Sequence, residues 1–105
     1  MIAEIVFIDL PKGTTREQAL ALYRETGEAW RGNPDLIEKY YFFDEVSSTG
    51  GGFYIWRDRN AAARWHGDDY KQKVLSHYGA PPRIVTLDAL LYVDPPRGVL
   101  QELPS

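Results

Sequence analysis

His66 is the side chain in this sequence best suited to acid–base chemistry, because imidazole gains and loses a proton near neutral pH. It lies in a helical stretch that is expected to pack on a sheet. His66 could therefore act as a general base toward a bound molecule. The indole N–H of the adjacent Trp65 could stabilise an oxygen that becomes negatively charged. The competing interpretation is a partly exposed helix histidine beside a tryptophan that fills the core.

A metal site is the alternative chemistry for this stretch. His66, Asp68, Asp69 and His77 are residue types that ligate metals. Gly67 interrupts the helix between the two histidines, and two aspartates at a helix start are better explained as capping residues. We therefore predict no metal ligands. The absence of cysteine also excludes disulfides, iron–sulfur clusters and thiol catalysis.

Further candidate binding residues lie on the predicted strands. Lys39 and Tyr41 share one strand face, where Lys39 either reaches water at the rim or directs a buried cation at a substrate oxygen. Trp56, on the next strand, either lines the pocket or fills the core. Asp88 lies among apolar residues and needs a partner, such as an arginine or a residue of a second copy. Arg83 is a candidate contact for an anion.

A hairpin that leads into a helix must position these residues. Strand-forming residues occupy 36–46 and 51–57, with a Ser/Thr/Gly turn between them and a helix N-cap at Asp58. The glycines at 50–52 lack the Gly-Lys-Ser/Thr ending of a phosphate-binding loop. We predict that they are turn and bulge residues.

The remaining elements follow from caps and breakers. A strand is predicted over 2–10, and a helix follows it with a capping box between Thr14 and Glu17. The helix after Asp58 resumes beyond Gly67, and the last strand is predicted over 83–93. We predict one domain over 1–94 and an irregular, Pro-rich tail over 95–105 that could act as a dimer arm.

The order strand, helix, strand, strand, helix, strand predicts an α+β fold of the ferredoxin-like, split βαβ type. A four-stranded antiparallel sheet would then carry its helices on one face. Yet the predicted strands are mainly apolar on both faces, and monomers rarely expose so large an apolar area. We therefore predict a homodimer through the free sheet face.

Composition excludes other classes of partner. The chain has 105 residues and a net charge of −3 without a cluster of Lys and Arg, so we expect no nucleic-acid surface. It lacks an apolar run of about 20 residues, which excludes a membrane span. Glu4 and Asp9 near its beginning are not typical of a signal peptide, so we expect a cytoplasmic protein.

The run PDLIEKYYFFDEVSSTGGGFYIWRDRNAAARW, followed by DALLYVDP, resembles the YdhR-like group of monooxygenase-type proteins. This group belongs to the dimeric α+β barrel superfamily, with the antibiotic biosynthesis monooxygenases. The most specific pieces are Pro34 to Lys39, the Gly51-Gly52 pair and the helix from Ala61 to Trp65. The resemblance implies a dimer with a pocket for small hydrophobic ligands between the sheet and the helices.

The resemblance also implies a reaction. Characterised relatives oxidise anthrone-like or quinol-like aromatics with O2 and use no flavin or metal, so we expect no cofactor. A deprotonated, electron-rich aromatic can itself reduce oxygen, and the protein need only take a proton and stabilise an oxyanion. Relatives that oxidise anthrones carry Asn, Trp and Tyr on the second helix, where this chain has Asn60, Trp65 and Tyr70. These residues are thereby implied in substrate binding and catalysis.

Two functions stay open from the sequence. One is a cofactor-independent monooxygenase that acts on a small aromatic, with pocket residues His66, Tyr41, Trp56, Trp65 and Tyr70. The other is a non-catalytic binder of a hydrophobic metabolite on the same dimeric fold. A haem-degrading protein of this fold would need an Asn in the first strand beside its histidine, and the chain offers only Asp9 there.

Overall fold

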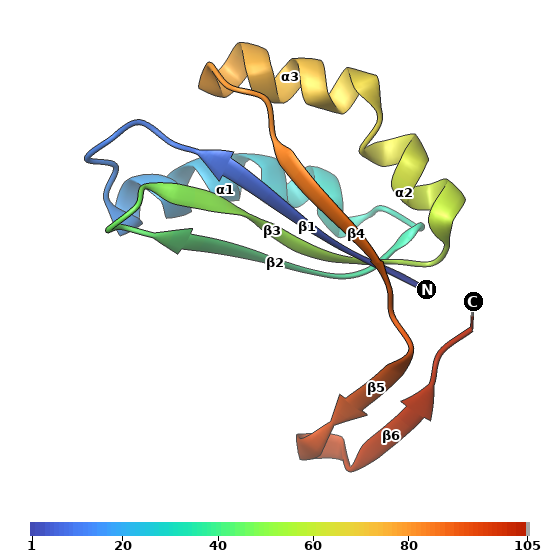
Figure 1. The fold of residues 1–105 in the computed structure, drawn as a ribbon. Coiled ribbons are helices and arrows are strands. Elements are labelled where there is room, and N and C mark those ends of the chain that lie inside the picture. The colour runs from blue at the N-terminus through green and yellow to red at the C-terminus, as the bar shows by residue number, and fades with distance from the viewer. Residues whose placement is uncertain (105) are drawn as a thin grey trace.

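The computed structural model describes residues 1–104 and has the predicted ferredoxin-like α+β architecture (Figure 1). One antiparallel sheet has four strands in the order β2-β3-β1-β4, and a separate hairpin pairs β5 with β6. The elements are β1 (Ile2–Asp9), α1 (Arg16–Arg31), β2 (Leu36–Asp44), β3 (Thr49–Trp56), α2 (Arg59–Trp65), α3 (Asp68–Tyr78), β4 (Arg83–Asp88), β5 (Leu91–Asp94), a 3-10 turn (Pro95–Arg97) and β6 (Val99–Glu102).

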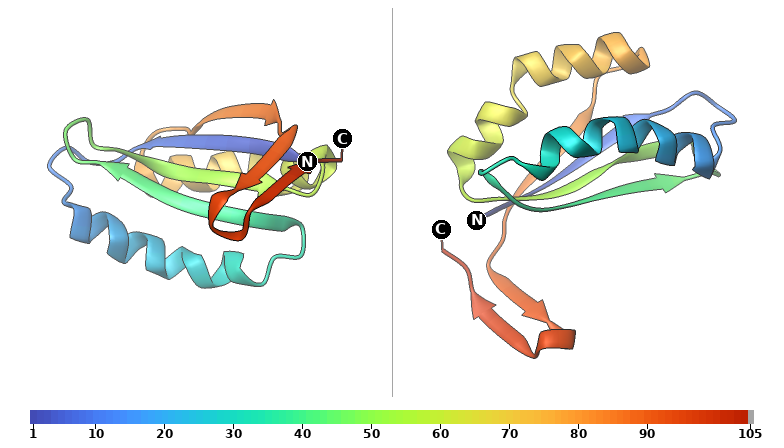
Figure 2. Two further views of the ribbon diagram at one scale, coloured as in Figure 1. Left: turned by 90° about the horizontal axis from the view of Figure 1, so that it is seen from below. Right: turned by 180° about the vertical axis from the view of Figure 1, so that it is seen from behind.

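The three helices lie on one face of the sheet, and the hairpin β5–β6 projects on the other side (Figures 1 and 2). Alternate residues of β1 are buried beneath the helices: Ile2, Glu4, Val6 and Ile8. The core therefore lies between the helices and this face of the sheet. None of the helices in residues 1–104 is long and apolar enough to span a bilayer.

The cap of α1 lies one residue beyond the predicted position. Thr15, not Thr14, accepts a hydrogen bond from the Gln18 N–H, and the Gln18 side chain completes the capping box. Thr14 instead closes a turn, with its backbone N–H and its hydroxyl both bonded to the Pro11 carbonyl. The predicted N-cap of α2 is confirmed, because the Asp58 carboxylate accepts from the Ala61 N–H at 2.8 Å.

The predicted strand over 51–57 begins earlier, because Gly50 lies inside β3 rather than in the turn, and Gly51 and Gly52 pair in unbroken register with β1 and β2 rather than forming a bulge. Gly51 has φ +147°, and a Cβ there would collide with the carbonyl oxygen of Val6. A Cβ on Gly50 would collide with the Tyr23 hydroxyl. That hydroxyl donates to the Phe42 carbonyl and accepts from the Gly51 N–H, both at 3.0 Å. The glycine run thus lets Tyr23 of α1 insert its hydroxyl between β2 and β3.

The predicted last strand over 83–93 is divided in two, and part of the predicted irregular tail is a strand. The division falls after Asp88, where the Ala89 N–H donates to the Met1 carbonyl and the chain leaves the sheet. Gly98 is left-handed and reverses the chain, so that β6 pairs with β5. The apolar side chains of this hairpin are mostly exposed, and its role as a dimer arm stays a prediction.

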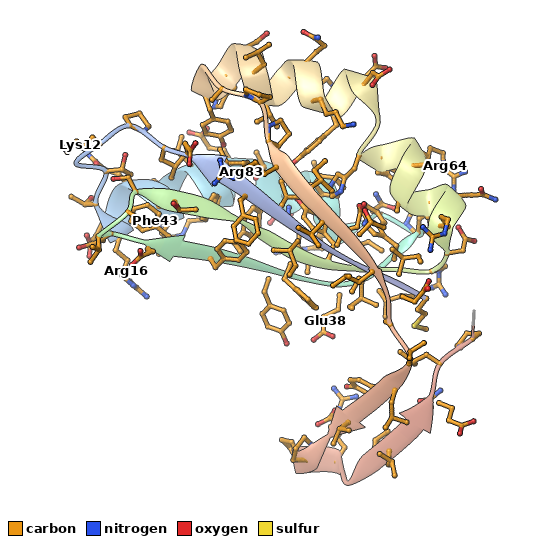
Figure 3. All side chains as sticks on the ribbon, in the orientation of Figure 1. Lys12, Arg16, Glu38, Phe43, Arg64 and Arg83 are labelled. Atoms are coloured by element: carbon orange, nitrogen blue, oxygen red, sulfur yellow. The ribbon has the colours of Figure 1, made fainter. Side chains whose placement is uncertain are left out.

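The sheet face opposite the helices is apolar and uncovered. The register places Tyr40, Phe53, Ile5 and Val85 in one row across all four strands. Tyr40 is 61% exposed and Val85 42%. Glu38 also points away from the helices on this face (Figure 3).

Candidate active site

A row of polar side chains crosses the helix-covered face of the sheet. Strand register aligns Lys39 of β2 with Tyr54 of β3, Tyr54 with Glu4 of β1, and Glu4 with Thr86 of β4. Adjacent strands lie about 4.8 Å apart, so the backbones of Lys39 and Glu4 are about 10 Å apart. Trp30 of α1 packs on Tyr54 of this row, and Tyr70 of α3 packs on His66, the residue that ends α2.

Glu4 and His66 form a buried pair at the centre of the row. The Nδ1 atom of His66 lies 2.7 Å from Oε1 of Glu4, and both side chains are almost fully buried. The same Oε1 accepts from the Trp56 indole N–H at 3.0 Å, and Oε2 accepts from the Thr86 hydroxyl at 2.5 Å. Burial raises the pKa of Glu4, but the hydrogen bonds from His66, Thr86 and Trp56 outweigh burial and leave this pKa below its ordinary value.

An ionised Glu4 determines which nitrogen of His66 carries the proton. A carboxylate can only accept hydrogen bonds, so Nδ1 must be the donor. In the neutral imidazole, Nε2 then presents its lone pair. Among residues 1–104, Nε2 is the buried side-chain nitrogen or oxygen that has no hydrogen-bond partner. The pair therefore has the arrangement of a general base, with a carboxylate that would stabilise the imidazolium once formed.

Aromatic rings enclose His66. The Tyr70 ring of α3 lies 4.4 Å from the imidazole centroid, and the Tyr54 ring packs edge-on at 4.3 Å. Trp56 and Trp30 follow at 5.1 and 6.0 Å. Burial raises the pKa of the Tyr70 hydroxyl to about 12, so it stays protonated at neutral pH. The base is thus surrounded by rings suited to stacking on an aromatic compound.

Lys39 lies at the other end of the row, among three aromatic rings. Its Nζ is 3.9 Å from the centroid of Tyr41 and 4.4 Å from those of Trp30 and Tyr54. Burial lowers the pKa of Lys39 from 10.5 to about 7. The negative faces of the rings attract the ammonium form and oppose this effect. The residue Lys39 is half-buried, and both alternatives for it, a rim residue and a buried cation, stay predictions.

Two grooves lie between α1 and β2. The first has a volume of about 260 Å³ and is lined by Gly27, Trp30, Arg31, Leu36, Ile37, Glu38, Lys39 and Tyr41. The second, of about 220 Å³, is lined by Arg16, Ala19, Leu20, Tyr23, Tyr41, Phe42, Phe43 and Glu45. Lys39 and Tyr41 face these grooves, whereas His66 lines neither of them.

The structure brings most of the predicted site residues together. His66, Tyr70 and Trp56 are in contact, and Lys39 stacks on Tyr41 next to them. Trp56 is fully buried, and its indole N–H donates to Glu4, so in this structure it orients the Glu4 carboxylate.

Trp65 and Asn60 lie at the periphery. The Trp65 ring touches Trp30 edge-on, but its indole N–H already donates to the Asp35 carboxylate at 2.9 Å. Asn60 is exposed in the first turn of α2. The roles assigned to these two residues stay predictions.

The other charged residues singled out in the sequence have ordinary partners. Asp88 pairs with Arg59 at 3.0 Å, and Arg83 makes two hydrogen bonds to Asp9, all at exposed positions. Within residues 1–104, no three side chains of His, Asp or Glu come together in an arrangement that could hold a metal ion.

Glu4, Trp30, Tyr54 and Thr86 are site residues that the sequence analysis did not identify. Glu4 is separated from His66 by 62 positions, and only the packing of the C-terminal end of α2 over β1 brings them together. One signal was present, since Glu4 is a carboxylate within an otherwise apolar strand and such a residue requires a buried partner.

The similarity of this chain to known proteins is found in the comparison of structures and not in the comparison of sequences. Neither a protein-family model nor a curated protein matches this sequence. Solved structures do match. A monooxygenase from the gene ActVA-Orf6 of Streptomyces coelicolor, in complex with nanaomycin D, is 16% identical with a TM-score of 0.65, and the match covers 90% of this chain and 91% of that one.

Two further structures resemble the chain. An antibiotic biosynthesis monooxygenase is 25% identical with a TM-score of 0.59, over 86% of this chain and 99% of that one. Rv0793 from Mycobacterium tuberculosis is 17% identical with a TM-score of 0.60, over 85% and 94%. The fold is therefore that of the antibiotic biosynthesis monooxygenases, while the finer assignment to the YdhR-like group stays a prediction.

Proposed function

We propose that this protein is a cofactor-independent monooxygenase that oxidises a small aromatic or quinol-type compound with O2. The observation that carries the proposal is the buried Glu4–His66 pair with its free Nε2 among aromatic rings. The match at 25% identity to an antibiotic biosynthesis monooxygenase supports a monooxygenase-like function. The neighbour that holds nanaomycin D supports a small organic ligand.

The proposed reaction begins with proton transfer. Nε2 of His66 takes a proton from an activated CH2 group or a phenol of the bound substrate, and Glu4 at 2.7 Å stabilises the resulting imidazolium. Because rings enclose Nε2, the substrate must displace Tyr70 from the imidazole and take its place in the stack.

Oxygen then reacts with the substrate anion. The anion transfers electrons to O2, and a C–O bond forms at the carbon that carries the negative charge, which is the deprotonated carbon of a CH2 group or the ring CH para to a phenolate oxygen. Cleavage of the O–O bond leaves one oxygen on the carbon as a carbonyl, and the other leaves as water with the two hydrogens of the CH2 group, or with the phenolic and the ring hydrogen. The substrate supplies all the electrons, so the protein contributes proton transfer, orientation and exclusion of water.

Oxygen uptake by the purified protein with a panel of anthrones and hydroquinones tests the proposal. Uptake above the spontaneous rate should fall about 10²- to 10⁴-fold in His66→Ala, the usual contribution of a general base. His77→Ala is the matched control, because His77 is exposed on α3 and should leave the rate unchanged. No uptake across the panel, or equal loss in both variants, would contradict the proposal.

One observation favours the alternative, a non-catalytic binder of a small hydrophobic metabolite. His66 lines neither groove, so a ligand in either groove would not meet the base. A binder should quench tryptophan fluorescence saturably, because Trp30 lines the first groove, and should consume no oxygen. Quenching that Trp30→Phe abolishes, without oxygen uptake by the wild type, would identify this function.

The proposed enzyme acts as a homodimer. The uncovered row Tyr40, Phe53, Ile5 and Val85 supports packing of two sheets face to face. The hairpin β5–β6 projects on that same side and exposes Leu91, Val93 and Leu100, which supports a role as an arm against the second copy.

A further inference from the structure

We propose that Lys39 is a nucleophilic amine that forms an imine with small aromatic or apolar carbonyl compounds bound in the first groove between α1 and β2. This activity is separate from oxygenation, because it needs neither O2 nor His66. It follows from the position of one unpaired amine at the wall of a groove.

The amine is fixed in place. The side-chain stem of Lys39 lies against the backbone of β3, where a Cβ on Gly52 would be only 3.3 Å from Cε. Nζ then lies between the rings of Trp30, Tyr41 and Tyr54 at 3.9–4.4 Å from their centroids. Among residues 1–104, no carboxylate forms an ion pair with it. Such an amine is positioned like a nucleophile and lacks the partner of a structural lysine.

Burial favours a neutral amine, although the faces of the three rings attract the ammonium form. Burial lowers the pKa of Lys39 to about 7. The titratable hydroxyls that face it belong to Tyr41 and Tyr54, and burial raises the pKa of each, so both are uncharged at neutral pH. Arg31 on the groove wall contributes a positive charge, which also favours the neutral amine, whereas the Glu38 side chain points to the other face of the sheet. A desolvated lysine in apolar surroundings is the usual form of an imine-forming residue.

The groove determines the class of carbonyl compound. Its volume of about 260 Å³ suits a compound of one ring, and its wall includes Trp30, Leu36, Ile37 and Tyr41 beside the amine. Aromatic and aliphatic side chains favour a ring or a short apolar chain over a sugar or a dicarboxylate. The compound would place its carbonyl carbon at Nζ and its apolar body along the indole of Trp30.

The step balances without an oxidant. The Nζ lone pair attacks the carbonyl carbon, a C–N bond forms, and the oxygen takes a proton to give a carbinolamine. The nitrogen lone pair then expels this oxygen as water, and loss of the remaining N–H proton leaves the C=N bond. One amine and one carbonyl compound thus give one imine and one water.

Reductive trapping tests the proposal. The full-length protein is incubated without oxygen at pH 7 with benzaldehyde and sodium cyanoborohydride, and the adducts are mapped by peptide mass spectrometry. A lysine in water is protonated at pH 7 to all but about one part in a thousand or less. We expect at least about tenfold more adduct on Lys39 than on each of the exposed Lys12, Lys71 and Lys73. The rate of adduct formation on Lys39 should be half-maximal near pH 7.

Matched variants complete the experiment. Lys73→Arg and His66→Ala should keep the Lys39 adduct, whereas Lys39→Arg should lose it. Retention in His66→Ala separates this activity from the proposed oxygenation, which that variant abolishes. Equal labelling of all four lysines, or no adduct on Lys39 in the wild-type protein, overturns the proposal.

Discussion

Replacement of Glu4 by Gln tests the central pair of the site most informatively. The carboxylate accepts three hydrogen bonds, from the His66 imidazole, the Trp56 indole and the Thr86 hydroxyl. A glutamine can keep its oxygen toward His66 and Trp56, because the Thr86 hydroxyl can turn and accept from the new amide. The variant therefore preserves the shape of the site and removes only its charge.

The expected loss of stability follows from this geometry. A hydrogen bond to a charged group stabilises by about 1 kcal/mol more than a neutral one, so the three bonds lose about 3 kcal/mol together. Relief of the desolvation cost of a buried charge offsets part of this, which leaves a net loss of about 1–3 kcal/mol. Glu4→Leu should lose more, about 3–5 kcal/mol, because it strands two buried N–H donors.

Urea unfolding at pH 7 measures these differences, and oxygen uptake measures the effect on the base. We expect Glu4→Gln to reduce kcat by up to about 10⁴-fold, the effect of replacing the carboxylate beside a general-base histidine by an amide. Thr86→Val is the control, because it removes one bond to Glu4 and leaves His66 untouched. The reasoning fails if Glu4→Gln is as stable and as active as the wild type.

Three further predictions concern the rest of the fold. The pKa of Glu4 in the folded protein lies below 4.5, so the stabilisation that ionised Glu4 provides is complete above that pH and is lost as the pH falls through the folded-state pKa. In urea unfolding curves at decreasing pH, the difference in unfolding free energy between the wild type and Glu4→Gln should therefore close. Gly51→Ala should cost about 2–4 kcal/mol in urea unfolding, because its φ of +147° and the nearby Val6 carbonyl leave no space for a Cβ, whereas Gly27→Ala in α1 should stabilise by about 1 kcal/mol. Leu87→Glu on the uncovered sheet face should convert the proposed dimer to a monomer in light scattering, and a wild type that is monomeric at micromolar concentration would refute the proposed dimer.

The sequence predicts the fold well because its signals are local. The capping aspartate at 58, the helix stop at Gly79 and the alternation of the strands each depend on a few neighbouring residues, and the structure confirms them. The errors at Thr14 and at Gly50 to Gly52 are of a different kind. They arise because a turn and a buried tyrosine from another element decide which residue adopts which backbone conformation.

The site is less predictable because it depends on register. His66 and Lys39 can be recognised in the sequence as residues that could take part in catalysis, but the residues that contact them come from distant elements. Tyr54 lies between Glu4 and Lys39 only through the pairing of β2, β3 and β1, and Glu4 meets His66 only because the end of α2 packs over β1. A single sequence contains the alternation of each strand but not its alignment with the next one.

The proton affinity of the Glu4–His66 pair toward a bound aromatic is the quantity that tests the proposed function most directly. An anthrone or phenol whose anion has its own absorption band can be titrated into the protein without oxygen, so that ionisation is observed apart from oxidation. We predict that the wild type and His77→Ala produce the anion band at neutral pH and that His66→Ala does not. Saturable binding with the compound still protonated in the wild type would contradict the assignment of His66 as the base.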